Sequence, residues 1–94
     1  MSTIQDIAHE HLTADDTILQ THHSIYDDVE GTLIISKHAL LFLHEQGWRY
    51  KHYDVRLLVP YTHLKTLVVE ASHRLAVTTL DTSFHIITLD IEAS

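Results

Sequence analysis

Short runs of apolar residues, each bounded by a short polar turn, follow one another from residue 17 to residue 89. These runs are rich in β-branched residues or alternate apolar with polar positions, and both patterns are typical of strands. Turns this short join neighbouring strands into hairpins, so the pattern predicts one curled antiparallel sheet. The seven predicted strands are Thr17–Ile25, Thr32–Ser36, Ala39–His44, Trp48–Val59, Thr66–Ala71, Arg74–Leu80 and Ser83–Leu89.

The first dozen residues have a different periodicity. Between Thr3 and Leu12, apolar residues recur at spacings of three and four, which places them on one face of a helix. Ser2 or Thr3 is suited to cap the start of this helix, and Asp6 lies in its first turn. The chain is therefore predicted to be one mainly β domain over residues 1–94, with a helix at residues 3–12 and a β core at residues 15–90.

Glycine and proline mark the ends of the fourth predicted strand. Gly47 is expected to supply a positive φ in the turn that precedes it. The strand from Trp48 to Val59 is long enough to contain a bulge, and Pro60 is expected to end it because proline has no N–H for the ladder. Tyr61–Lys65 is predicted to be a turn or a single helical turn.

The last two predicted strands define a closing hairpin. A loop at Asp81-Thr82 would pair Val77 with Ile86 and Leu75 with Thr88. Phe84 would then lie opposite Thr79, on a face predicted to form the core. The opposite face is also more apolar than a water-facing sheet needs, which predicts that something covers it. The apolar residues on that opposite face are Ala76, Leu80, Ile87 and Leu89.

Length and composition limit the class of protein. Ninety-four residues with 45% apolar side chains fit one modest globular core. The longest uninterrupted apolar run is Ala39–Leu43, far shorter than the roughly 20 residues that span a bilayer. Residues 1–20 lack the basic start and apolar centre of a signal peptide, and the chain has no cysteine. These features predict a cytoplasmic protein without disulfides or thiolate chemistry.

The charge balance argues against nucleic acid as a partner. Thirteen acidic residues against six basic ones give a formal charge of −7 with histidine neutral. Because nucleic acid binding depends on phosphate neutralisation by Lys and Arg, this balance disfavours it, and it disfavours anionic membranes less strongly. Protonation of all ten histidines would change the charge from −7 to +3. Histidines paired across an oligomer interface would therefore act as a pH switch between about pH 5 and 7.

The order of these elements resembles the pleckstrin-homology-like (PH-like) superfold, in particular GRAM domains and small bacterial PH-like domains. The resemblance covers about Asp15 to Asp90 and rests on Gly31-Thr32-Leu33, Leu40-Leu41-Phe42, Val59-Pro60 with Leu64, and the closing hairpin Leu75–Leu89. It implies a seven-stranded curled antiparallel sheet or barrel that serves as a binding scaffold rather than as an enzyme.

The chain also departs from that family. It has Ala39 where the family often has a basic residue, and Asp81-Thr82 where the family often has Asp-Gly. The family fold ends in a helix that plugs one open end, whereas only Ile91–Ser94 follow the predicted β core. Either the helix is missing, or the N-terminal helix replaces it, or a second subunit covers the opening. We therefore expect self-association, with oligomer contacts at Ile4, Ile7, Leu12, Ile87 and Leu89.

Two candidate binding surfaces follow from the resemblance and from composition. The family often binds phosphoinositides through Lys and Arg in the first loop, but here Asp27, Asp28 and Glu30 would repel phosphate. A ribbon that alternates aromatic and cationic side chains is the candidate interaction surface. Its residues are Trp48, Arg49, Tyr50, Lys51, Tyr53 and Arg56. The alternative is that Trp48 and Tyr50 cap the sheet while Arg49 and Lys51 are only solvated.

No arrangement in the sequence predicts a metal site, a cofactor or catalysis. His9 and His11 point to different sides of a helix, as His22 and His23 do on a strand, and His52 with Asp54 supply only two ligands. No Gly-x-Ser-x-Gly elbow or phosphate-binding glycine loop is present. The predicted function is a non-enzymatic PH/GRAM-like interaction module that self-associates and binds protein through a sheet edge or an apolar face. The alternative is a peripheral lipid-binding domain that uses Trp48–Arg56.

Overall fold

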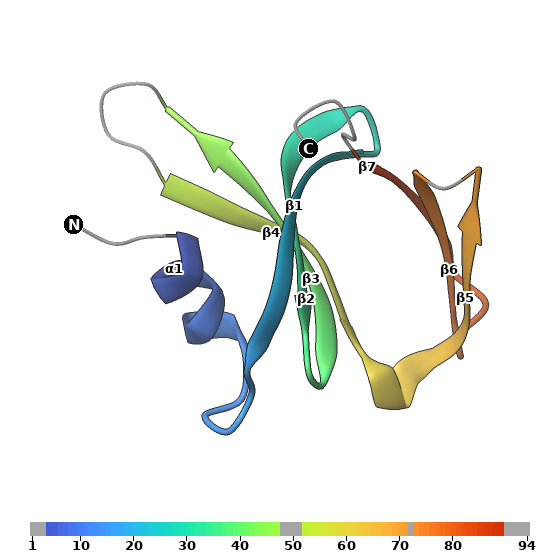
Figure 1. Ribbon diagram of the computed structural model, residues 1–94, viewed down its shortest axis with the longest axis horizontal. Helices are drawn as coiled ribbons and strands as arrows, with labels where there is room; N and C mark the ends of the chain where they lie inside the picture. Colours follow the sequence, from blue (N-terminus) through green and yellow to red (C-terminus); the bar gives the residue numbers. More distant parts are fainter. Residues whose placement is uncertain (1–3, 48–51, 72, 90–94) are drawn as a thin grey trace.

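The computed structural model describes residues 4–47, 52–71 and 73–89, and it consists of one curled seven-stranded sheet with a helix on its outside (Figure 1). All neighbouring strands are antiparallel, in the order β4-β3-β2-β1-β7-β6-β5. The mainly β class, the seven strands and the short N-terminal helix are confirmed. The elements are α1 (Ile4–His11), β1 (Ile18–Tyr26), β2 (Val29–Ser36), β3 (Ala39–Gln46), β4 (His52–Pro60), the 3₁₀ helix η1 (Tyr61–His63), β5 (Leu64–Glu70), β6 (Arg74–Thr79) and β7 (Phe84–Leu89).

The sheet curls so that β5, β6 and β7 face β2, β3 and β4 across an interior (Figure 1). β1 connects the two halves, because it pairs with β2 along its length and with β7 over Ser24–Tyr26. On the side of the curl away from the β1–β7 pairing, η1 connects β4 to β5 (Figure 1). β4 and β5 are the two ends of the strand order, so the curl does not close by hydrogen bonding between them.

The interior is filled by large aliphatic side chains from both halves of the sheet. Phe42 lies fully buried among them, and the edge of its ring meets Tyr26 at a centroid distance of 5.5 Å. Burial of this apolar surface is the main favourable term that holds the two halves together. The buried residues of this interior cluster are Leu33, Phe42, Leu57, Val59, Leu75 and Ile87.

A second apolar cluster lies outside the curl, between α1 and the sheet (Figure 1). Ala8 is completely buried against Ile34, Leu41 and Leu43. β2 and β3 are thus covered on both faces, which explains why their sequences are nearly continuous apolar runs. Three predicted oligomer contacts, Ile4, Ile7 and Leu12, are partly buried in this outer cluster. α1 therefore covers the outer face of the chain's own sheet and does not plug the opening of the curl.

The local predictions for the third and fourth strands are confirmed where the structure describes them. Phe42 pairs with Leu57 whereas Leu43 pairs with Val55, so Arg56 is the extra residue of a bulge in β4. Pro60 is the last residue of β4, and Gly47 has φ 82°. Trp48 and the next three residues lie outside the described residues.

The predicted register of the closing hairpin is wrong by one residue. Leu75 pairs with Ile87, Val77 with His85, and Thr78 with Phe84. The loop holds three residues, Leu80–Thr82, because the Thr79 N–H donates to the Ser83 carbonyl and Thr82 adopts φ 68°. This left-handed position closes a three-residue loop, whereas the prediction assumed a two-residue loop.

A slip of one residue exchanges the two faces of β7. Phe84, predicted to lie in the core, is 63% exposed on the outer face. Ile87 is fully buried in the interior cluster and Leu89 packs against it, so the prediction that placed these two residues on the opposite face is wrong. Ile87 is therefore not available as an oligomer contact.

Thr82 is a position where the backbone conformation suits glycine better than threonine. A side chain with Cβ in the left-handed region costs about 1–2 kcal/mol, and glycine loses part of that gain through backbone entropy. We expect Thr82→Gly to raise the free energy of unfolding by about 0.5–1 kcal/mol, measured by urea denaturation. Thr82→Ala keeps Cβ and is expected to give no gain. Equal effects of the two variants would show that the conformation at Thr82 is not strained.

Candidate functional site

The most exposed apolar segment of the described chain is the free edge of β5. In this strand Leu67, Val68 and Val69 are consecutive and are 44%, 51% and 62% exposed. From Thr66 to Glu70 the strand pairs with β6 without irregularity. We call residues Thr66–Glu70 the β5 edge. An edge strand presents backbone N–H and C=O groups that can pair with another chain, and a regular apolar edge does so most readily.

The side chains of the β5 edge alternate between the two faces of the sheet. Leu67 lies opposite Val77, and Val69 lies opposite Leu75, so both belong to the face that lines the interior. Val68 lies opposite Ala76 on the outer face. Leu67 and Val69 remain exposed because no strand pairs with β5 on its other side. An added strand would cover both rows of side chains.

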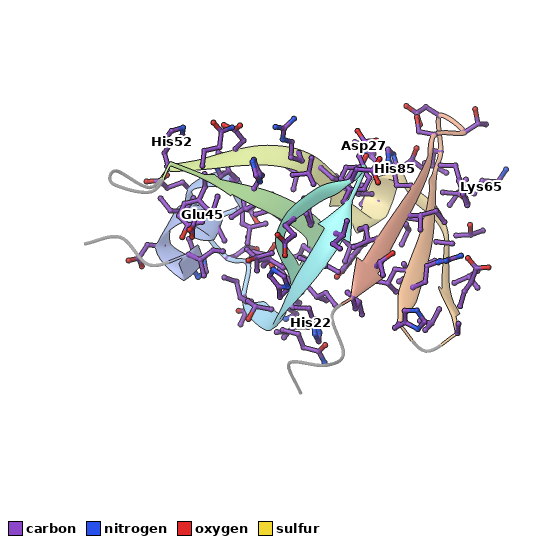
Figure 2. The ribbon with its side chains drawn as sticks, turned by 90° about the horizontal axis from the view of Figure 1, so that it is seen from above. His22, Asp27, Glu45, His52, Lys65 and His85 are labelled. Atoms are coloured by element: carbon purple, nitrogen blue, oxygen red, sulfur yellow. The ribbon has the colours of Figure 1, made fainter. Side chains whose placement is uncertain are left out.

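The other end of the sheet is better protected against pairing. β4 carries the bulge at Arg56 and ends at Pro60, and both features interrupt a ladder. Charged side chains also lie along it, with Arg56 Nη2 3.9 Å from Asp54 Oδ2. β5 has one comparable feature, a bulge at Lys65, whose side chain points away from the rest of the molecule (Figure 2). The β5 edge is therefore the more accessible of the two sheet edges.

A shallow hollow adjoins the outer face of β7. It has a volume of about 610 Å³ and lies between β7 and the turn that joins β1 to β2. Phe84, Ile86 and Ile25 contribute its apolar lining. Asp27 and His85 also line this hollow and lie at the same end of the molecule (Figure 2). Asp27 and Asp28 form the turn itself, both with positive φ. The lining of the hollow thus combines apolar side chains with two carboxylates.

A second pocket, of about 420 Å³, opens between β4, η1 and the β6–β7 loop. It contains His63, Asp81 and His85 beside Leu57 and Val59. The Asp81 carboxylate accepts hydrogen bonds from the Thr79 hydroxyl and the Ser83 N–H, and these bonds lower the pKa of Asp81. His85 Nδ1 lies 2.7 Å from the Tyr26 hydroxyl. Asp81 and His85 therefore both have structural partners within the chain.

The structure describes only part of the predicted interaction surface, the ribbon of aromatic and cationic residues. Trp48, Arg49, Tyr50 and Lys51 lie outside the described residues. Tyr53 packs against the outer cluster beneath α1, and its hydroxyl donates to Glu45 Oε2 at 3.0 Å. Burial and then the nearby Glu45 carboxylate raise the pKa of Tyr53.

Arg56, the other placed residue of the ribbon, occupies the β4 bulge beside Asp54. The two residues of the ribbon that the structure places, Tyr53 and Arg56, thus contact neighbours within the chain.

Two neighbouring histidines of β1 and the two buried serines have local partners. His22 Nε2 lies 2.8 Å from the Gln20 side chain, and His23 Nε2 lies 3.3 Å from Glu30. Ser24 and Ser36 are fully buried, and each hydroxyl hydrogen-bonds within its own part of the sheet. Across residues 4–47, 52–71 and 73–89, no three His, Asp or Glu side chains gather closely enough to hold a metal ion. In the same ranges, no helix has the length and apolar character needed to cross a membrane.

Comparison with known proteins supports the fold alone. No protein-family model matches the chain, and no curated protein sequence matches it significantly. Among solved structures, the chain is similar to the C-terminal domain of an unknown protein from Leishmania infantum, with a TM-score of 0.62 and 18% sequence identity. The similarity covers 92% of this chain and 84% of that chain. It shows that this sheet arrangement exists in another protein and assigns no activity.

The sequence pattern did not predict the exposure of Leu67, Val68, Val69 and Phe84. The first three form an unbroken apolar run, which is the available signal, but Leu33–Ile35 forms a similar run in the centre of the sheet. The pattern alone does not distinguish a strand covered on both faces from an apolar edge strand. Phe84 was missed because its face depends on the loop length of the closing hairpin.

Proposed function

We propose that this chain is a non-enzymatic, PH-like interaction domain that binds an extended protein segment by adding it as a strand to the β5 edge. The observation that carries the proposal is the regular, unpaired run Thr66–Glu70 with Leu67, Val68 and Val69 exposed. Strand addition gives affinity through main-chain hydrogen bonds and specificity through alternate side chains. An added segment would gain contacts to Leu67 and Val69 on one face and to Val68 on the other.

The PH-like and GRAM-like assignment is supported by the order of short motifs and by the curled seven-stranded sheet. We further propose a cytoplasmic location, because the chain contains no cysteine for the disulfides common in secreted domains of this size. Phosphoinositide recognition is disfavoured because the β1–β2 turn presents Asp27 and Asp28, which repel phosphate. The net charge of −7 disfavours nucleic acid for the same reason.

Substitution of Val68 tests the proposed edge. Val68 is half-exposed at the centre of the run, so lysine there is expected to leave the fold intact. A charge at this position would lose an apolar contact and would oppose a covering strand. Binding peptides can be selected from a random display library against the immobilised chain. They are expected to bind Val68→Lys at least about tenfold more weakly than the unmodified chain, a loss of about 1.4 kcal/mol in binding free energy, measured by calorimetry. When such a peptide is titrated into the unmodified chain and followed by NMR, chemical-shift changes are expected at the backbone amides of Thr66–Glu70.

Leu19→Lys is the matched control, since Leu19 is 61% exposed on β1 and lies away from β5. Its peptide affinity is expected to remain within about twofold of the unmodified chain. Equal affinities for Val68→Lys and the unmodified chain, or amide shifts confined to β4, would contradict the proposal. Strong, salt-sensitive co-sedimentation with anionic vesicles would favour a peripheral lipid-binding domain instead.

A further inference from the structure

We propose that the strand added to the β5 edge is β5 of a second copy of this chain, in an antiparallel two-fold pairing with Val68 opposite Val68. This inference rests on the proposed function and names its partner. Antiparallel pairing of two identical edges generates a closed C2 dimer, because each copy uses the same surface. The pairing would join two seven-stranded sheets into one continuous sheet across the dimer axis.

Symmetry restricts the possible registers. Residues directly opposite in an antiparallel pair lie on the same face of the sheet. A two-fold axis perpendicular to the sheet keeps corresponding faces together, so an interior-facing residue must oppose an interior-facing residue. With Val68 on the axis, Leu67 faces Val69 of the second copy, and Thr66 faces Glu70 of the second copy. All five residues of the regular segment are then paired.

The neighbouring symmetric registers fit less well. Centring on Leu67 places Lys65, which occupies the bulge, opposite Val69 of the second copy. Centring on Val69 places Val68 opposite Glu70 and Leu67 opposite Ala71, which lies in a turn with φ 50°. Each of these registers sets a charged residue against an apolar one. The register centred on Val68 sets apolar against apolar at every central position.

The same register continues the rows of side chains that cross the sheet. On the interior side, Val69 pairs with Leu75, which pairs with Ile87, and the last two are buried. Leu67 of the second copy would extend this row beyond Val69. On the outer side, Val68 pairs with Ala76, which pairs with Ile86. The outer rows of the two copies would meet at the two-fold axis. There Val68 of one copy would face Val68 of the other, which is a favourable cross-strand pair of β-branched residues.

Charge complementarity favours the antiparallel direction. Glu70 of one copy would lie beside Thr66 of the other, with the Lys65 ammonium of that copy one residue further along. Symmetry repeats this arrangement at the other end of the pair. A parallel pairing would instead set Glu70 beside Glu70 and Lys65 beside Lys65, which is destabilising.

Addition of β5 to β4 of another copy would build an open filament rather than a dimer. The Arg56 bulge and Pro60 on β4 oppose that contact. A five-residue strand pair falls below the roughly 1,200 Å² of a standard interface, so we expect a weak dimer, with a Kd on the order of 10–100 µM.

Cysteine scanning tests both the dimer and its register, because the chain contains no cysteine. Facing Cα atoms in an antiparallel pair lie about 4.5–5.5 Å apart, which a disulfide can bridge, whereas diagonal residues lie about 7–8 Å apart. Under mild oxidation, Val68→Cys is expected to form a disulfide-linked dimer at least about tenfold faster than Leu67→Cys or Val69→Cys alone. A mixture of Leu67→Cys and Val69→Cys is expected to cross-link between the two variants. Leu19→Cys, which is also exposed, is expected to stay monomeric.

Sedimentation of the unmodified chain over a concentration series is expected to show a monomer–dimer equilibrium that Val68→Lys abolishes. A chain that remains monomeric at all concentrations, with no Val68→Cys dimer, would overturn the inference, and retained peptide binding at Thr66–Glu70 would leave the proposed function standing. Self-linkage of Leu67→Cys or Val69→Cys without Val68→Cys would overturn the register. Rapid linkage of Phe84→Cys would place the contact on the outer face instead.

Discussion

Gly31→Ala is expected to lower the free energy of unfolding by about 3 kcal/mol. A Cβ added at Gly31 would lie 2.2 Å from the Leu43 carbonyl oxygen and 2.8 Å from Cζ of Phe42. The first of these neighbours is backbone of the adjacent strand, and the second is a fully buried ring of the interior cluster. Neither can move without opening the β2–β3 ladder or displacing the core. Domains of this length have about 5–14 kcal/mol of stability, so the loss is a large fraction of the total.

Gly47→Ala provides the matched control, since Gly47 is the other glycine of the chain. Gly47 is exposed and has φ 82°, so alanine there costs backbone strain of about 1 kcal/mol without a steric clash in the core. Urea denaturation followed by far-UV circular dichroism measures both variants. A loss for Gly31→Ala no greater than that for Gly47→Ala would mean that β2 and β3 separate easily at this point.

Gly31 illustrates which features of the fold could be predicted from the sequence and which could not. The run Gly31-Thr32-Leu33 was singled out because it resembles a family motif, and the strand around it was predicted. The reason for glycine is the close approach of the Leu43 carbonyl oxygen, which depends on how the paired strands β2 and β3 lie at this point. The strands themselves were predictable because period-two patterns and turn residues act locally. Their boundaries differ from the observed ones by at most a few residues in the described ranges.

The mispredicted features depend on a rare backbone conformation in one loop and on the order of the strands in the sheet. The two-residue loop expected at Asp81-Thr82 was wrong because Thr82, a residue that rarely adopts positive φ, does so here. That change moved Phe84 out of the core and Ile87 into it. The exposure of Leu67–Val69 was equally hidden, because it follows from the position of β5 at the end of the strand order. The candidate site could therefore be located only after the strand order was known.

Asp16 is a second residue whose importance the local pattern concealed. It lies between the predicted helix and the first predicted strand, where the sequence is polar, yet it is buried where α1 leads into β1. Asp16 Oδ1 accepts hydrogen bonds from the Thr17 N–H at 2.8 Å and the His38 N–H at 3.2 Å. Asp16 Oδ2 lies 2.8 Å from the Ser36 hydroxyl, which donates to it or to the Ala39 carbonyl at 2.9 Å. One carboxylate thus joins the start of β1 to the β2–β3 turn.

This network also reaches the connection between β4 and β5. The Tyr61 hydroxyl in η1 donates to the Ser36 carbonyl at 2.6 Å, and the Tyr61 N–H donates to the His38 carbonyl at 2.9 Å. Burial and then the Asp16 charge raise the pKa of Tyr61. The Asp16 carboxylate is therefore placed to stabilise the β2–β3 turn against which η1 packs, and η1 in turn sets the start of β5.

Asp16→Ala is expected to lower the free energy of unfolding by about 2–3 kcal/mol, because it removes the acceptor of several hydrogen bonds to a charged group. Burial acts to raise the pKa of Asp16, but the hydrogen bonds from Ser36, Thr17 and His38 together lower it below its ordinary value. The stabilisation is therefore fully present above the unfolded-state pKa of about 4 and is lost as the pH falls through the lower folded-state pKa. Urea denaturation between pH 2 and pH 7 measures this dependence.

Asp16→Asn separates the charge from the shape of the side chain, since its amide retains one acceptor oxygen but replaces the other with a donor. The difference in stability between the unmodified chain and Asp16→Asn is expected to be largest from pH 5 to pH 7 and to shrink toward pH 2. Asp15→Asn, at the exposed neighbouring position, is expected to change stability by less than about 0.5 kcal/mol. A constant difference across this pH range would show that the ionised carboxylate is not what stabilises the β2–β3 turn.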